Sequence, residues 1–357
     1  MVRAVKYTIP ACLLLLGLSS CNTTKFLEPG DYLLQRNRID IRGKVDERSD
    51  LTYDLTTFYK QEPNTNWLFL IPREWFYFKT QGKNASFARW QRRALGEVPA
   101  IYNDSLTQVS AEAMALYLQF KGYFQAEVLP QGSPRRQRMG VTYYVLPGNR
   151  YHIDSVFYSS PDPVMDSLLQ EIEPESYLQR GAPLDLQLLG QEKDRISNYL
   201  RNHGYANFFS NSFDKLEIDT SQKPQQANLY LHILPPFEDS VHAQFYIGEI
   251  NVYTDFDPSE DNIVGDTVIA GLRFLLGEDG FIVNPNVLRE AISLRPGDQY
   301  SQENFNQTNS QLSALGIYRF VRIKQTVDSI YPNTLNFSIQ LTPNNRMALG
   351  AYLDINY

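Results

Sequence analysis

The residues with the clearest chemistry lie at the start of the chain. Arg3 and Lys6 precede an apolar stretch, Ala11–Leu18, and two serines then lead to Cys21. A basic start, an apolar core too short to span a membrane as a stable helix, and small residues before a cysteine are typical of a bacterial lipoprotein signal. We therefore expect Cys21 to become the lipid-bearing first residue of the mature chain. The alternative is an ordinary secretory signal that happens to end in a cysteine.

Elsewhere the sequence contains no pattern that is typical of a catalytic or metal centre. Cys12 lies inside the predicted signal, so the mature chain is expected to have no disulfide. Nucleophile-elbow, HExxH, phosphate-loop and dinucleotide-binding patterns are absent from the sequence, and its histidines lack metal-ligand spacing. The sequence thus predicts a protein that is not an enzyme and uses neither metal nor cofactor. The histidines are His152, His203, His232 and His242.

The charge balance also limits the possible partners. The chain has 33 basic and 40 acidic residues and a net charge of −7, and loss of Arg3 and Lys6 with the signal makes it more negative. This balance argues against nucleic acid as a partner. After Cys21 no stretch approaches about 18 consecutive apolar residues, so no further membrane-spanning helix is expected.

The elements that must position any functional residues recur three times. Each repeat has an amphipathic helical stretch that ends at a glycine followed by an aromatic or branched residue. Glycine is suitable there because a helix that stops and reverses ends easily on a residue that tolerates positive φ. The three endings are Phe120–Phe124, Asn202–Tyr205 and Ala314–Tyr318.

The helix before each glycine is expected to bury one face. We expect Ser110 and Ser301 to be the N-caps of the first and third helices. The expected buried faces are Ala113, Leu116, Tyr117 and Phe120; Leu189, Ile196, Tyr199 and Leu200; and Phe305, Leu312 and Leu315.

Strands complete each repeat. Strict alternation later in each repeat predicts a half-buried strand, and another strand is expected upstream of each helix pair. The order is therefore strand, helix, helix, strand, strand, an α+β unit in which two helices cover one face of a small mixed sheet. The alternating residues are Val141, Tyr143 and Val145; Leu229, Leu231 and Ile233; and Leu335, Phe337, Ile339 and Leu341. The upstream strands are Leu33–Ile41, Tyr151–Tyr158 and Phe245–Tyr253.

At this point the sequence resembles a known family. Gln179–Pro183 and Leu294–Ser301 are similar to the loop that joins the two helices of POTRA modules in the BamA and TamA outer-membrane assembly superfamily. Together with the lipoprotein signal, the chain resembles the TamL-type lipoproteins, which are lipid-anchored relatives of TamA. The expected organisation is a signal over residues 1–20, POTRA modules over 21–147, 148–236 and 237–343, and the start of a barrel over 344–357.

The residues from Met347 to Tyr357 alternate between an apolar face and a small or polar face. This pattern suits the first strand of a transmembrane β-barrel, and an ordinary last strand of the third module is the alternative. A bacterial barrel needs at least about eight strands to satisfy its backbone hydrogen bonds. We therefore expect the natural product to continue into a barrel, as the resembling family does, or the sequence to be a truncated form.

Two surfaces are candidates for binding. An open sheet edge can accept an extended chain through main-chain hydrogen bonds, and the edge strands are expected at Phe208–Ile218 and at Tyr318–Gln325. The residues of the second that could bind a client or partner are Tyr318, Arg319, Phe320, Val321, Arg322 and Ile323; protection of the edge by its basic residues is an equal alternative. The other surface is an aromatic insertion in the first module with Trp67, Phe69, Trp75 and Phe76, for which internal packing is the favoured alternative.

The third module contains an additional segment, Asp255–Gly280. Its pattern predicts a hairpin whose tight turn is Gly277–Gly280, and we expect it to extend the sheet. The alternative is that it sets the angle of the arm or gates the lumen of a barrel.

The resemblance implies a function in the outer membrane, with the POTRA modules in the periplasm. It implies an arm that receives unfolded outer-membrane proteins, or a TamB-like periplasmic partner, for insertion by an attached barrel. Phospholipid transport with a TamB-like bridge is the first alternative. A POTRA adaptor lipoprotein without a barrel is the second.

Overall fold

The computed structural model describes residues 23–68, 71–237, 240–257, 263–277 and 280–344. Cys21, Phe69 and the alternating segment from Met347 to Tyr357 lie outside these residues. The chain divides into two compact units, one formed by residues 1–154, 180–187 and 220–227 and the other by 155–179, 188–219 and 228–357. Among the helices that the structure describes, none combines the length and the apolar character needed to cross a membrane.

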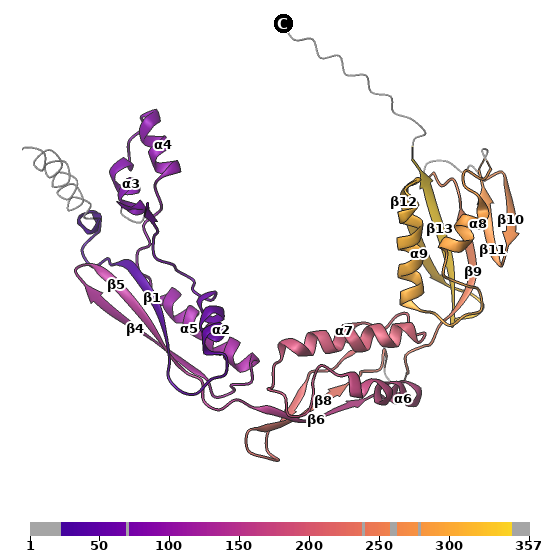
Figure 1. Ribbon diagram of the computed structural model, residues 1–357, viewed down its shortest axis with the longest axis horizontal. Coiled ribbons are helices and arrows are strands. Elements are labelled where there is room, and N and C mark those ends of the chain that lie inside the picture. The colour runs from indigo at the N-terminus through magenta and orange to yellow at the C-terminus, as the bar shows by residue number, and fades with distance from the viewer. Residues whose placement is uncertain (1–22, 69–70, 238–239, 258–262, 278–279, 345–357) are drawn as a thin grey trace, which may run out of the picture. The chain divides into compact units, whose positions relative to one another are not determined.

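The first module contains a three-stranded sheet in the order β1-β5-β4, with β1 parallel and β4 antiparallel to the central strand. Val141, Tyr143 and Val145 of the central strand are buried against the helices, as the alternation predicts. The elements are β1 (Leu33–Ile41), α2 (Arg48–Thr56), α5 (Asp104–Phe120), β4 (Glu127–Arg135) and β5 (Arg138–Leu146) (Figure 1).

The buried face of α5 differs from the expected one. Its buried residues include Ala111, Met114 and Leu118, whereas Leu116 and Phe120 of the predicted face are exposed. Apolar residues occur on two adjacent stripes of this helix, and only packing on the sheet selects between them. Ser110 is also not an N-cap, because the helix begins earlier. Asn103 caps it by accepting a hydrogen bond from the Leu106 N–H.

An insertion separates α2 from α5 in the first module. It contains a two-stranded antiparallel ribbon followed by two short helices. A short 3-10 turn, η1 (Thr24–Phe26), precedes the first strand of the module. The elements of the insertion are β2 (Asn66–Trp67), β3 (Ile71–Pro72), α3 (Arg73–Thr80) and α4 (Ser86–Ala94).

The second module repeats the order strand, helix, helix, strand, strand, with a sheet order of β6-β8-β7. Leu229, Leu231 and Ile233 are buried, as expected. The predicted edge strand over residues 208–218 is wrong, because most of that segment is irregular and β7 has only three residues. The elements are β6 (His152–Ser159), α6 (Pro163–Ile172), η2 (Glu173–Glu175), α7 (Gln187–Asn202), η3 (Ser210–Ser212), β7 (Glu217–Asp219) and β8 (Gln226–His232).

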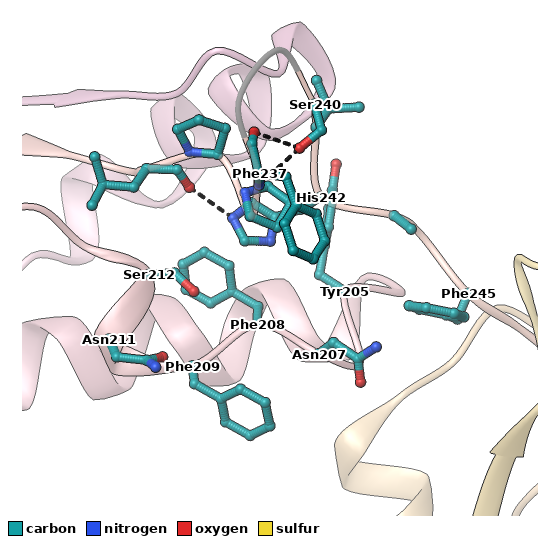
Figure 2. A pocket seen from close by; sticks show the side chains of 15 residues that line it. Tyr205, Asn207, Phe208, Phe209, Asn211, Ser212, Phe237, Ser240, His242 and Phe245 are labelled. Atoms are coloured by element: carbon teal, nitrogen blue, oxygen red, sulfur yellow. Dashed lines mark hydrogen bonds between the residues drawn. The ribbon is translucent and has the colours of Figure 1, made fainter.

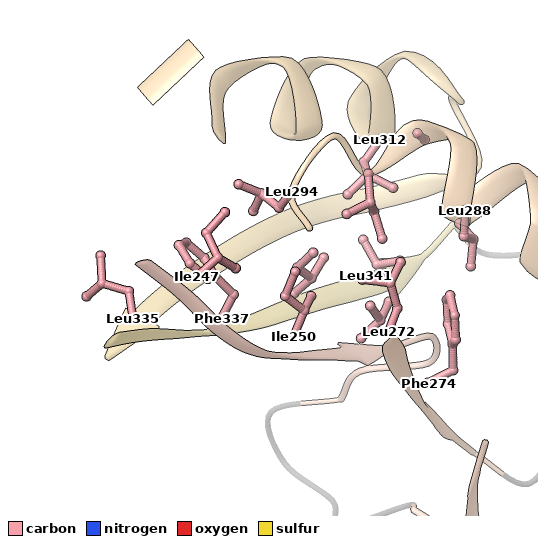
Figure 3. Close-up of a cluster of buried hydrophobic side chains, with 14 of the residues drawn as sticks. Ile247, Ile250, Leu272, Phe274, Leu288, Leu294, Leu312, Leu335, Phe337 and Leu341 are labelled. Carbon is pink, nitrogen blue, oxygen red and sulfur yellow. The ribbon is translucent and has the colours of Figure 1, made fainter. Parts of the chain in front are cut away.

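The third module has a five-stranded sheet in the order β10-β11-β9-β13-β12. Buried residues of β9, β11 and β13 pack against α8 and α9, including Ile250, Phe274 and Phe337 (Figure 3). Ser301 caps α9 as expected, accepting from the Asn304 N–H. The elements are β9 (Tyr246–Tyr253), β10 (Gly265–Ile269), β11 (Leu272–Leu276), α8 (Pro285–Ala291), α9 (Gln302–Ala314), β12 (Tyr318–Val327) and β13 (Thr334–Pro343).

The additional segment of the third module extends the sheet, as expected. Its hairpin consists of β10 and β11, and β11 pairs in parallel with β9. The turn between β10 and β11 is formed by Ala270 and Gly271, which both have positive φ. Two consecutive residues with positive φ are typical of the tight hairpin turns that follow the twist of paired strands. The predicted turn follows β11, where the Gly280 N–H donates to the Gly277 carbonyl at 3.0 Å.

Candidate functional site

The candidate binding edge is the outer side of β12. This strand pairs along its length with β13, and no other described strand pairs with its outer side. Toward the other edge of the sheet, β11 of the β10-β11 hairpin pairs with β9, so β9 is not an edge strand. The ten residues of β12 therefore present the main-chain donors and acceptors that an extended segment could use to add a strand.

A β-bulge determines which side chains of this edge face the core. The register between β12 and β13 shifts between Tyr318 and Phe320, so Arg319 is an extra residue. After the bulge, Val321 and Ile323 pack against the core, whereas Phe320 is 58% exposed. Without the shift, simple alternation from Tyr318 would have placed Phe320 toward the core instead.

The three modules differ in how open their corresponding edges are. The edge strand β4 contains Pro130 and Pro134, and a proline in an edge strand removes a donor from its solvent side. In the second module β7 is too short for an extended ladder. Because β12 contains no proline, it is the described strand at this position best suited to main-chain pairing.

The candidate edge is basic. Arg319, Arg322 and Lys324 are exposed, and no acidic residue occurs between Tyr318 and Val327. The Arg319 guanidinium lies 5.0 Å from the ring centre of Phe320, within the range of a cation–π contact. These charges discourage association of two such edges with each other, and they would favour an incoming segment with acidic side chains.

Tyr318 anchors the start of the edge strand in the core. Its hydroxyl oxygen is buried and has no hydrogen-bond partner among the described residues. Burial, with a contribution from the negative charge of Asp255, raises the pKa of Tyr318 to about 12. The buried hydroxyl is a cost to the fold that a phenyl ring of the same shape would not have.

We expect Tyr318→Phe to stabilise the third module by up to about 1 kcal/mol, because it removes an unpaired buried hydroxyl. Because the pKa of Tyr318 is raised by folding, ionisation of this tyrosine opposes folding. The wild-type protein therefore shows no such loss of stability below the unfolded pKa of about 10, and it loses stability as the pH rises through about 12. The variant should lack this alkaline loss. Urea unfolding at neutral and alkaline pH measures both effects, and equal pH profiles for the two proteins would contradict the assignment.

The first and second modules meet at a joint of main-chain hydrogen bonds, which we call the first joint. The Tyr151 N–H donates to the Gly122 carbonyl at 3.0 Å, and the Leu184 N–H donates to the Tyr151 carbonyl at 2.9 Å. Lys121 forms a half-buried ion pair with Asp185, with 2.8 Å between Nζ and Oδ2. All of these residues belong to one compact unit.

The second joint repeats this pattern between the second and third modules. The Phe245 N–H donates to the Gly204 carbonyl at 2.8 Å, and the Tyr300 N–H donates to the Phe245 carbonyl at 2.9 Å. Asn202 adds a side-chain bond, accepting from the Glu303 N–H at 2.9 Å. The helix-ending glycine that the sequence identifies is thus also the residue that links one module to the next.

A pocket of about 480 Å³ lies in the second compact unit beside the linker that follows β8. Figure 2 shows its aromatic lining, in which the rings of Phe208 and His242 are 5.2 Å apart. The His242 ring donates from Nε2 to the Leu234 carbonyl at 2.9 Å, and none of the described lining residues is Asp, Glu, Lys or Arg. The pocket can hold an apolar side chain.

The aromatic residues predicted in the insertion have different surroundings. Phe76 is buried and packs edge-to-face with both Trp67 and Trp75, so these rings form a small core. Internal packing therefore accounts for Phe76, while Trp67 is still partly exposed. The sequence indicated Trp90 only as the far end of the aromatic run and did not indicate Phe87; these are the two exposed aromatic side chains of α4. The sequence signal for this exposed pair was that two aromatic residues three positions apart share a short segment with several arginines.

The described part of the chain offers no metal centre. No three His, Cys, Asp or Glu side chains come together there as metal ligands would.

Comparisons with known proteins found a family match for part of the chain and similar solved structures. Residues 278–343 match the POTRA family, described as Surface antigen variable number repeat. The POTRA3-5 segment of BamA from Haemophilus influenzae is 11% identical, with 88% of this chain and 99% of that chain covered and a TM-score of 0.40. POTRA1-3 of Omp85 from Anabaena is 12% identical, with coverage of 90% and 98% and a TM-score of 0.31. No curated protein shows a significant sequence match to the chain.

The fold is therefore α+β, a tandem array of POTRA-like modules with small mixed sheets. This assignment follows from the matched residues of the third module and from the element order that all three modules share. POTRA domains are typical of outer-membrane assembly proteins and are generally not catalytic.

Proposed function

We propose that this chain is the lipid-anchored periplasmic arm of a TamL-like outer-membrane assembly component, and that β12 receives extended segments of client proteins by strand addition. The observation that supports this most directly is the ten-residue edge of β12, which is free of proline and unpaired on its outer side among the described residues. Main-chain pairing requires little sequence specificity, which suits a receiver of many clients.

The clients are unfolded outer-membrane proteins, whose strands alternate apolar and polar residues. Such a strand can pair with β12 and place one set of side chains beside Phe320, Arg322 and Lys324. A TamB-like partner could use the same edge in the same way. Lipid at Cys21 then holds the arm at the outer membrane.

Hydrogen exchange of the mature chain tests strand addition. With a peptide patterned like a barrel strand, we expect slower exchange at alternate amides of β12, because only every second amide of an antiparallel edge faces outward. The same peptide with prolines at alternate positions is the control ligand, and β4, with Pro130 and Pro134, is the control edge. Uniform protection, or protection confined to α9, would contradict strand addition.

Two neighbouring proline variants sharpen the test. Of Arg322→Pro and Ile323→Pro, one removes a donor to β13 and the other removes an outward donor, because consecutive residues of an edge strand alternate in direction. The variant that removes an outward donor should keep the native hydrogen exchange of the β13 amides. It should bind the peptide at least about tenfold more weakly than the wild-type chain. Unchanged binding by that variant would exclude β12 as the receiving edge.

A further inference from the structure

The insertion of the first module contains a surface that the proposed strand addition does not use. On α4, Phe87 is 66% exposed and Trp90 is 55% exposed, and their rings stack with centres 5.8 Å apart. Ala88 is the buried residue of this helix. An exposed pair of stacked aromatic rings on a short helix marks a surface that is covered in some state of the protein.

The stretch of sequence around this pair carries only positive charge. From Trp75 to Gly96 the sequence has no acidic residue, although the whole chain is acidic with a net charge of −7. Arg89 and Arg93 are exposed on α4, and no ion pair is found for either among the described residues. The basic residues of this stretch are Lys79, Lys83, Arg89, Arg92 and Arg93. The occupant of the surface should therefore carry negative charge.

The start of the mature chain is fixed to the same insertion. Thr23 is fully buried, and its hydroxyl donates to Glu74 Oε1 on α3 at 3.4 Å. Phe26 stacks on Phe78 of α3, with ring centres 5.3 Å apart and planes at 16°. Burial raises the pKa of Glu74, and the hydrogen bond from Thr23 partly opposes this shift. These contacts hold residues 23–26 against α3.

Helix α3 in turn holds α4. Arg92 donates from Nη1 to the Thr80 carbonyl at 3.1 Å, and Arg73 donates from Nε to the Leu95 carbonyl at 3.1 Å. The first bond joins α4 to the last residue of α3. The second joins the first residue of α3 to Leu95, which directly follows α4. The aromatic pair of α4 and the fixed residues 23–26 belong to one small assembly.

This arrangement limits the distance between the insertion and a lipid on Cys21. Cys21 lies two positions before Thr23, with only Asn22 between them, and an extended chain spans at most about 7 Å over two positions. A bilayer that holds the lipid must then lie close to the insertion. Aromatic rings favour the membrane interface, and basic residues near an anionic surface are attracted to its headgroups.

We propose that α4 binds the surface of an anionic phospholipid bilayer through Phe87 and Trp90, with Arg89 and Arg93 contacting the headgroups. The lipid at Cys21 and α4 then contact the same bilayer. This inference rests on the lipid anchor of the proposed function, and it assigns the exposed face of α4 to lipid and not to a protein partner.

The test uses the mature chain with Cys21→Ser, so that no lipid contributes to binding. Vesicles of phosphatidylglycerol and phosphatidylcholine in equal parts are compared with vesicles of phosphatidylcholine alone, by co-sedimentation and by tryptophan fluorescence. We expect binding to the anionic vesicles, a shift of the emission to shorter wavelength, and a loss of binding in high salt. Equal binding to both kinds of vesicle, or to neither, would overturn the proposal.

Three variants localise the effect. Phe87→Ser with Trp90→Ser, and separately Arg89→Glu with Arg93→Glu, should each weaken binding at least about tenfold. Tyr53→Ser is the matched control, because Tyr53 is an aromatic residue of the same module that is 72% exposed on α2. Circular dichroism checks that each variant is folded. Retention of full binding by both double variants would show that another surface contacts the lipid.

A separate labelling experiment distinguishes failure of the anchor from failure of this inference. Cells that express the full chain are grown with radiolabelled palmitate, and Cys21→Ala should lose the label. Label at Cys21 without vesicle binding would refute the role of α4 alone, whereas vesicle binding without label would refute the anchor alone. A photo-crosslinker at Trp90 that captures a protein and no lipid in cells would also contradict the proposal.

Discussion

Substitution of Glu192 by alanine is expected to destabilise the second module by about 3–5 kcal/mol, because it leaves a largely buried arginine without its partner. Glu192 is fully buried on α7, and Arg195 contacts its carboxylate through two hydrogen bonds of 3.0 and 2.7 Å. The Tyr158 hydroxyl and the Tyr177 N–H also donate to it, at 2.6 and 3.0 Å. The carboxylate thus connects α7, β6 and the loop after η2.

The pH dependence of this network follows from the direction of its pKa. Burial alone would raise the pKa of Glu192, but the hydrogen bonds from Arg195, Tyr158 and Tyr177 lower it overall. Its stabilising contribution is therefore complete above the unfolded pKa of about 4.3 and is lost as pH falls through the lower folded value.

Glu192→Gln is the matched control for both effects. It preserves the size and an oxygen acceptor but loses the charge, so a smaller loss of stability and a flatter acid profile are expected. Hydrogen exchange of the α7 amides reports on this module without requiring the whole chain to unfold in two states. If Glu192→Ala left that exchange unchanged, the network would not support the module.

Gly122→Ala is expected to destabilise the first joint by about 3 kcal/mol, the sum of backbone strain near 1 kcal/mol and overpacking of roughly 1–3 kcal/mol. Gly122 has a φ of +86°, and an added Cβ would lie 2.4 Å from the Leu184 carbonyl oxygen. The obstacle is backbone that takes part in the joint itself, so it cannot move aside without loosening the hydrogen bond to Tyr151. Faster exchange of the Tyr151 and Leu184 amides measures this loss.

The two equivalent glycines provide graded controls. At Gly204 an added Cβ would meet the side chain of Gln299 at 2.9 Å, which can move more easily than backbone. At Gly316 nothing lies within 4 Å, so only the strain of positive φ applies, and Gly316→Ala should cost about 1 kcal/mol. The expected order of damage is Gly122, then Gly204, then Gly316. Equal losses at all three positions would show that packing at the joints adds nothing to the strain.

Part of the candidate edge could be derived from sequence. The run from Tyr318 to Ile323 was expected to be an edge strand, and β12 is the outermost strand of its sheet. The bulge at Arg319 could not be derived, because it depends on the register with β13. The openness of each edge was partly visible as well, since Pro130 and Pro134 of β4 are present in the sequence. Only the sheet order shows that they occupy an edge.

The aromatic insertion shows the same limit. The sequence identified a region rich in Trp and Phe, but it could not tell that Phe76 forms a small core while Phe87 and Trp90 are exposed. Composition is the same for a buried and an exposed aromatic residue. Their burial depends on contacts such as those between α3 and the residues after Cys21, which are about 50 positions apart in the chain.

The sequence by itself determined the features that depend on local periodicity. Alternation identified the central strands β5, β8 and β13, and the glycines at 122, 204 and 316 identified where helices end, because both patterns arise from backbone geometry over a few residues. Tertiary structure decided which stripe of α5 is buried, where β12 bulges, and that Gly122 and Gly204 also form the joints between modules. These outcomes depend on contacts between residues far apart in the chain, and no local pattern specifies them.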